Sequence, residues 1–130
     1  MTPEEDLRLA ELDALEKWLK KFCEEHPPFR YTREDTKEWE YYTRHQIKVY
    51  AGRNFIFDAI CQRGSYGYEQ GLLEIRGRAV INQEDEDGYD VLGWLKARDV
   101  IRRFKHYLWW WSDGELGEWD EQDRRIYEVN

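Results

Sequence analysis

The side chains that most often carry catalysis are few in this sequence and widely spaced. His26, His45 and His106 do not have the spacing of paired metal ligands on a helix. Cys23 and Cys61 lie outside any Cys-x-x-Cys motif, so the sequence predicts neither a zinc site nor a redox dithiol. No nucleophile-elbow motif is present, although a Ser/His/Asp or Cys/His assembly formed only in the fold stays an alternative. We therefore expect a protein that is not an enzyme and that needs no metal or cofactor.

A glycine- and tyrosine-rich loop over residues 63–71 is the next feature with chemical potential. It lacks the Gly-Lys-Ser/Thr sequence of a phosphate-binding loop. Its glycines suit a strand connection with positive φ angles, whereas Tyr66 and Tyr68 suit a binding loop, because tyrosine is amphipathic and loses little entropy when ordered. Both interpretations stay open. In the second, the tyrosines contact a protein partner, or they stack on an anionic ligand that is held by Arg63, Arg76 and Arg78.

Acidic residues exceed basic ones and form clusters. The chain has 28 Asp and Glu against 20 Lys and Arg, a formal net charge of −8, with clusters at 4–6, 84–90 and 113–123. The middle cluster does not fit a calcium-binding EF-hand loop, because the first and twelfth positions would be Gln83 and Trp94. Such clusters are usually solvated faces, but carboxylates on one face can also imitate phosphates and occupy a basic groove. On that hypothesis the contact residues include Glu84, Asp85, Glu86 and Asp87.

Aromatic residues make up 16% of the chain, and seven of them are tryptophans, so the question is which ones lie outside the core. In the run 108–111, Leu108 and Trp111 can face a core together, but Trp109 and Trp110 cannot both join them on one helix. At least one of these two must be exposed, or covered by another subunit or by the acidic tail that contains Trp119. We select Trp109 and Trp110 as candidate partner contacts.

The hydrophobic pattern predicts two helices. The first begins with a capping box at Thr2, ends at 26–28, and repeats apolar residues every three or four positions, at Leu12, Leu15, Leu19 and Phe22. The second covers 96–111 and ends at 112–114, and its apolar face consists of Ala97, Val100, Ile101, Phe104, Leu108 and Trp111.

Between the helices, the pattern predicts an antiparallel sheet of about four strands. Residues 29–38 are polar and irregular, and from Trp39 to Ala51 the period changes to two, which places His45 on the apolar face. We expect His45 to be a satisfied core residue there. Residues 55–61 are apolar on both faces and predict a central strand. Further strand-like segments cover 72–75, 78–81 and 89–94, and a short strand at 125–129 could return to the sheet.

These elements predict a single two-layer α+β domain over residues 1–130, in the order α-β-β-β-β-α. Its parts are an N-terminal helix in 1–28, a sheet in 39–95, a helix in 96–111 and an acidic tail in 112–130. No apolar run approaches the roughly 20 residues of a membrane span, and the first residues lack the basic and apolar regions of a signal peptide. We therefore expect a cytoplasmic protein with reduced cysteines and no membrane partner.

Three short blocks of the sequence, Phe57–Cys61, Gly64–Ile75 and Gly93–Ile101, resemble small uncharacterised phage and prophage proteins of Gram-positive bacteria. The blocks cover less than half of the chain. The resemblance implies no activity that can be carried over to particular residues. It implies a context, since small acidic phage proteins often act on host proteins, and inhibitors of CRISPR nucleases are frequent among them.

Three functions follow as hypotheses. The leading one is a phage-encoded inhibitor in the host cytoplasm, which binds a nucleic-acid-processing defence enzyme such as a CRISPR effector through an acidic and aromatic surface and does not bind nucleic acid itself. The second is a sponge that sequesters a small molecule such as a cyclic nucleotide. The third is a structural protein that forms a homodimer by burying Trp109 and Trp110.

Overall fold

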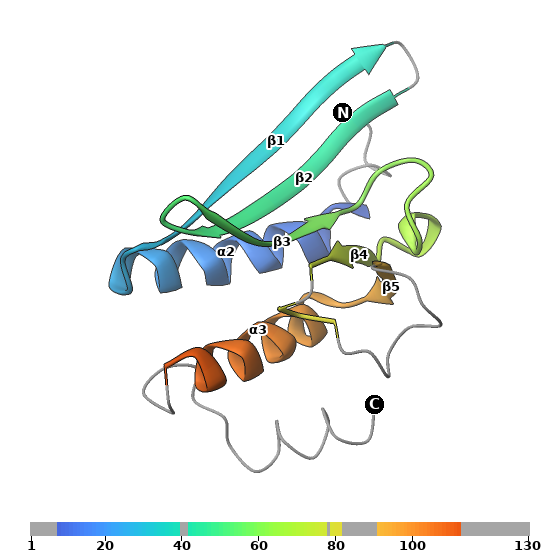
Figure 1. The fold of residues 1–130 in the computed structure, drawn as a ribbon. Helices are drawn as coiled ribbons and strands as arrows, with labels where there is room; N and C mark the ends of the chain where they lie inside the picture. The colour runs from blue at the N-terminus through green and yellow to red at the C-terminus, as the bar shows by residue number, and fades with distance from the viewer. Residues whose placement is uncertain (1–7, 40–41, 78, 82–90, 113–130) are drawn as a thin grey trace.

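The computed structural model describes residues 8–39, 42–77, 79–81 and 91–112 (Figure 1). The elements are α2 (Ala10–Glu25), β1 (Phe29–Trp39), β2 (Tyr42–Ala51), β3 (Asn54–Ile60), the 3-10 turn η1 (Tyr68–Gln70), β4 (Leu73–Arg76), β5 (Val91–Leu95) and α3 (Ala97–Trp111). The strands form one antiparallel sheet in the order β1-β2-β3-β4-β5. The predicted α+β fold is confirmed, with five strands among the described residues in place of about four.

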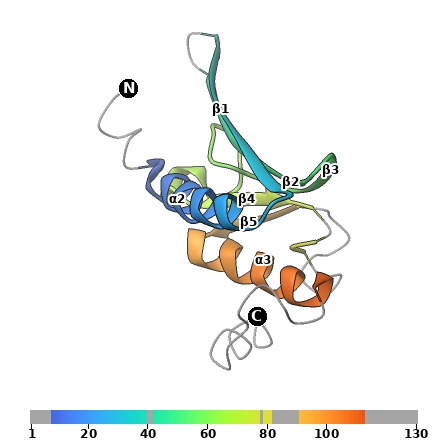
Figure 2. The same ribbon diagram turned by 90° about the vertical axis from the view of Figure 1, so that its left-hand side faces the viewer.

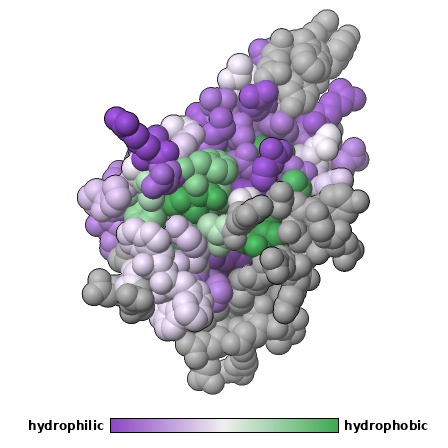
Figure 3. Space-filling model, viewed as in Figure 1, coloured by the Kyte–Doolittle hydropathy of each residue, from purple (hydrophilic) through white to green (hydrophobic). Residues whose placement is uncertain are grey.

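Helices α2 and α3 pack on one hydrophobic core that they share with the sheet, and they lie side by side in Figures 1 and 2. The helices contribute the apolar residues expected from their spacing, Leu12, Leu15, Leu19 and Phe22 from α2, and Ala97, Val100, Phe104 and Leu108 from α3. Figure 3 shows apolar side chains reaching the surface in the middle of one face, with hydrophilic side chains around them. None of the helices in the described ranges is long and apolar enough to cross a membrane.

The prediction that residues 29–38 are irregular is wrong, because they form β1, which pairs with β2 along its length. Arg33 and Asp35 hid the alternation, since they are charged at the positions of the strand that face α2, where a half-buried strand usually carries apolar residues. Their partners, described below, lie on α2 and β2. Trp39 consequently ends β1 and pairs with Tyr42, whereas the pattern placed it at the start of the next strand.

The pattern also predicts a strand at 78–81. In the structure, residues 79–81 do not pair with the described strands of the sheet. Gly77 follows β4 with a φ of +139°, and the N–H of Val80 donates to the Gly77 carbonyl (3.1 Å), which closes a turn. Val80 and Ile81 are buried in the core without ladder partners in the described sheet. Their apolar character reflects burial by packing, which periodicity over so short a run cannot distinguish from a strand.

Helix α3 ends where the pattern predicted, at Ser112, whose hydroxyl donates to the Leu108 carbonyl (2.7 Å). Its last residue, Trp111, was expected to face the core, and the structure leaves it exposed to solvent. Its surface is 51% exposed, and its ring makes an edge contact with Phe29. The predicted capping box at Thr2 and the predicted strand at 125–129 lie outside the described residues.

Candidate functional site

The glycine- and tyrosine-rich loop places one of its tyrosines against β5. The ring of Tyr66 stacks on the ring of Trp94, with centroids 5.2 Å apart and planes inclined by 18°. Both residues stay open to solvent, with exposed fractions of 54% and 58%. A pair of large aromatic rings that stack on one another but remain half in water is the kind of surface that marks interaction sites. Tyr66 and Trp94 are called the aromatic pair below.

The backbone of Trp94 has an uncommon conformation. Its φ of +58° lies in the left-handed region, where a bulky residue is an outlier. Such a conformation costs on the order of 1–3 kcal/mol, and it persists only where the surroundings impose it. Here the Trp94 N–H donates to the Tyr66 carbonyl (3.2 Å), and the pairing of β4 with β5 is irregular between Leu73 and Ile75. Strain of this kind concentrates at functional sites.

Two glycines allow the loop and β5 to approach each other closely. A Cβ atom added to Gly93 would overlap the Cβ atom of Tyr66. A Cβ atom added to Gly67, whose φ is +100°, would lie 2.9 Å from Leu72 Cβ and 3.1 Å from the backbone nitrogen of Trp94. The geometry of the aromatic pair therefore requires glycine at both positions.

A buried carboxylate holds the loop at the pair. The Tyr66 N–H donates to Oε1 of Glu74 (2.9 Å), and Glu74, on β4, is only 9% exposed. The N–H and the carbonyl of Tyr66 are thus both engaged, with Glu74 and Trp94 respectively. The pair rests on two strands as well as on the loop, so its rings are positioned before any partner arrives.

The other loop residues selected from the sequence have different neighbours. Tyr68 contacts Arg8, which precedes α2; Arg8 donates to its hydroxyl (3.4 Å) and lies 5.0 Å from its ring centroid. Arg76 is exposed and stands opposite Asp58 in the register of β3 and β4. Arg63 is exposed at the start of the loop, and Arg78 lies outside the described residues.

The tryptophans at the end of α3 form a second exposed group. Trp110 is 65% exposed, and its indole N–H donates to Nε2 of His106 (3.0 Å). Trp109 is half-buried, and its ring meets the edge of Trp110 at 5.3 Å. As expected from the helix geometry, these two rings do not both face the core. The selected acids Glu84, Asp85, Glu86 and Asp87 lie outside the described residues.

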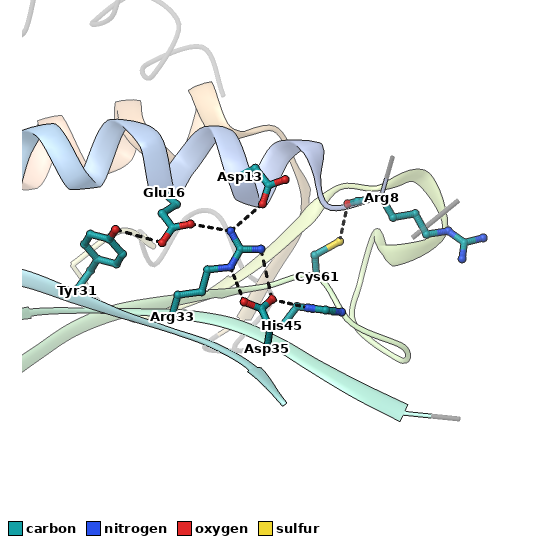
Figure 4. Close-up of polar contacts among 8 residues, drawn as sticks. All are labelled: Arg8, Asp13, Glu16, Tyr31, Arg33, Asp35, His45 and Cys61. Atoms are coloured by element: carbon teal, nitrogen blue, oxygen red, sulfur yellow. Dashed lines mark hydrogen bonds and ion pairs between the residues drawn. The ribbon is translucent and has the colours of Figure 1, made fainter. Parts of the chain in front are cut away.

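A polar network joins α2 to the β1–β2 hairpin (Figure 4). The Arg33 guanidinium contacts the carboxylates of Asp13 (2.7 Å), Glu16 (2.9 Å) and Asp35 (3.0 Å). Asp35 also pairs with Nδ1 of His45 (2.7 Å), and His45 is buried. The network satisfies charged groups between a helix and a strand, and it confirms that His45 is a satisfied interior residue.

His45 and Asp35 lie near Cys61, whose backbone N–H donates to the His45 carbonyl (3.2 Å), so the residue types of a Cys/His/Asp catalytic assembly are close together (Figure 4). The thiol of Cys61 instead donates to the backbone carbonyl of Arg8 (3.2 Å). Burial raises the pKa of this thiol to about 11, so it is protonated near neutral pH, and a protonated thiol is a poor nucleophile. Cys23 and Cys61 are both free thiols. Within the part of the chain that the structure describes, no group of three or more His, Cys, Asp or Glu side chains could hold a metal ion.

Two residues of this site were not selected from the sequence. The sequence pattern predicts Trp94 at the end of a strand and Glu74 as an ordinary strand residue. The available signal was the Gly93-Trp94 dipeptide, since a glycine inside a strand pattern can mark a close approach of another backbone. The buried position of Glu74 depends on how the loop folds back, which no local pattern reports.

Comparisons with known proteins add no family to this picture. No protein-family model, no curated protein and no solved structure matches the chain. The site is therefore interpreted from its own geometry.

Proposed function

We propose that this chain is a binding protein that contacts a protein partner through the aromatic pair. The observation that carries the proposal is the stacking of two half-exposed rings, one of which is held in a strained backbone conformation. Tryptophan and tyrosine are enriched among the residues that dominate binding energy. A pair positioned in advance loses little entropy when the partner docks, which favours affinity.

The chemistry of the remaining residues supports a binding role more than a catalytic one. The buried thiol of Cys61 is protonated near neutral pH, and His45 is engaged with Asp35 through Nδ1. We therefore propose that the chain acts by contact alone.

For the biological role, we propose that the partner is a nucleic-acid-processing defence enzyme of a bacterial host, and that binding inhibits it. The support is the resemblance of three sequence blocks to phage proteins and the net charge of −8, which would attract an enzyme with a basic groove. The small-molecule sponge has weaker support, because Tyr68 is engaged by Arg8, and Arg76 stands opposite a carboxylate.

The test is capture of partners from a host lysate at low and raised salt, with the wild-type chain, Trp94→Ala and Trp110→Ala as baits. We expect a nucleic-acid enzyme that is retained by the wild type and by Trp110→Ala and is lost from Trp94→Ala. Trp110 is the matched control, because it is an equally large and exposed tryptophan in another part of the fold. Loss from Trp110→Ala with retention on Trp94→Ala would move the site to the end of α3.

A further inference from the structure

We infer that the group bound at the aromatic pair is the guanidinium of an arginine side chain in a basic segment of the partner, with Glu74 as its counter-charge. This inference rests on the proposed function, and it names the chemistry that the site recognises. Two independent observations carry it, the exposed stacked rings and a buried carboxylate with an open acceptor atom.

The carboxylate of Glu74 is incompletely satisfied. Its Oε1 atom accepts the Tyr66 N–H at 2.9 Å, while Oε2 has no hydrogen-bond or ion-pair partner among the residues that the structure describes. Glu74 is nevertheless 91% buried, since its exposed fraction is 9%. A buried anion with an unused acceptor is unfavourable unless a donor or a cation completes it. A partner that brings a positive charge would remove this deficit.

The two halves of the site are close, because one residue belongs to both. Tyr66 supplies a ring of the aromatic pair, and its own N–H holds Glu74. A guanidinium is planar, so it can stack on an aromatic face while its N–H groups donate to a carboxylate. An ammonium offers no such plane. A neutral ring would leave Oε2 unsatisfied, and a phosphate would bring a second negative charge toward Glu74.

Among the residues that the structure describes, two arginines already lie over tyrosine rings in this way. Arg8 lies 5.0 Å from the ring centroid of Tyr68, in the same loop as Tyr66. Arg30 lies 4.1 Å from the ring centroid of Tyr50. The exposed faces of the aromatic pair offer a third such position, which a partner's arginine can fill. The net charge of −8 also favours the approach of a basic segment.

The experiment compares two short peptides, acetyl-Gly-Arg-Gly-amide and its citrulline analogue, which keeps the shape but carries no charge. Each is titrated into the ¹⁵N-labelled full chain, and the amide of Tyr66 and the indole N–H of Trp94 are followed by NMR. We expect the arginine peptide to shift both signals, and the citrulline peptide to bind roughly tenfold more weakly, as loss of a cation–π contact and of a charge-assisted hydrogen bond implies.

Glu74→Gln is the informative variant, because its amide oxygen can still accept the Tyr66 N–H while the charge is gone. In this variant the preference for the arginine peptide should fall to a few-fold, because the cation–π contact with the rings remains while the charge of Glu74 is lost. Trp110→Ala should keep the preference of the wild type for arginine. Equal binding of both peptides to the wild type, or no shift with either at millimolar concentration, would overturn the inference, and this comparison needs no variant to fold.

Failure of this inference is distinguishable from failure of the proposed function. If partner capture depends on Trp94 but the two peptides bind alike, the pair is a partner site that does not select a cation. If the arginine peptide is preferred but capture does not depend on Trp94, the cation site exists and the proposed function is wrong.

Discussion

Replacement of Trp94 by alanine and by glycine tests the strained backbone that positions the aromatic pair. In the left-handed region, a residue with a side chain lowers the free energy of unfolding by roughly 1–2 kcal/mol relative to glycine. Glycine, however, lowers the free energy of unfolding by about 0.5–1 kcal/mol relative to alanine, because it gives the unfolded chain more conformational freedom. At the φ of +58° observed for Trp94, the first effect exceeds the second. Trp94→Gly should therefore be more stable than Trp94→Ala by about 0.5–1 kcal/mol.

Trp110 provides the matched control for this comparison. It is exposed, as Trp94 is, but it lies in the last turn of α3, where alanine is favoured over glycine by up to about 1 kcal/mol. Trp110→Ala should therefore be more stable than Trp110→Gly, the reverse of the order at position 94. The contrast between the two positions, the sum of the two differences, amounts to about 1–2 kcal/mol, above the error of a paired comparison.

The assay is urea unfolding of the four variants, followed by circular dichroism in the far ultraviolet. The midpoints can be compared directly if the denaturant slopes agree, since an unchanged slope means that only stability has changed. If Trp94→Ala is more stable than Trp94→Gly, the left-handed conformation is not present in solution. The positioning of the aromatic pair would then need another explanation.

Three further predictions concern other residues. Gly93→Ala should destabilise the fold by about 1–3 kcal/mol in urea unfolding, because the new methyl group overlaps Tyr66 Cβ and no positive φ contributes at this position; an unchanged midpoint would contradict the close approach. Burial raises the pKa of Asp35, but hydrogen bonds from His45 and Arg33 outweigh it and hold the pKa below its ordinary value. Ionised Asp35 therefore stabilises the fold at pH values above that ordinary pKa, and this stabilisation is lost as the pH falls below about 4. Unfolding of Asp35→Asn should lack that acid-side loss, and an unchanged pH profile would refute it. Burial raises the pKa of Cys61 to about 11, so iodoacetamide should modify it near neutral pH at least about tenfold more slowly in the native chain than in the unfolded chain, and equal rates would show an accessible thiolate.

The parts of the fold that follow from local patterns were predictable from the sequence. Leu12, Leu15 and Leu19 repeat at helical spacing, and the residues of α3 do the same from Ala97 to Leu108, so the apolar faces emerge from periodicity alone. The central position of β3 follows from its apolar residues on both faces.

The parts that depend on distant contacts were not predictable. Strand β1 was missed because Arg33 and Asp35 occupy the alternating positions of the strand that face α2, and their partners Asp13, Glu16 and His45 come from α2 and β2. A periodicity rule counts them as polar, although in the fold they are satisfied.

The candidate site was predictable in part. Tyr66 could be selected because tyrosine in a glycine-rich loop suits binding. Its partner Trp94 could not, because the exposure of that ring depends on a positive φ in an irregular strand pairing. The role of Glu74 depends on a hydrogen bond to a loop that folds back over β4, and only the structure places these groups together.

The central claim is that this chain binds a partner through the aromatic pair, and titration calorimetry with the purified captured partner tests it most directly. The affinities of the wild type, Trp94→Ala and Trp110→Ala are measured at one salt concentration. A residue that dominates an interface contributes at least about 2 kcal/mol, so Trp94→Ala should bind roughly 30-fold or more weakly, while Trp110→Ala should match the wild type. Equal affinity of Trp94→Ala and the wild type would contradict the account.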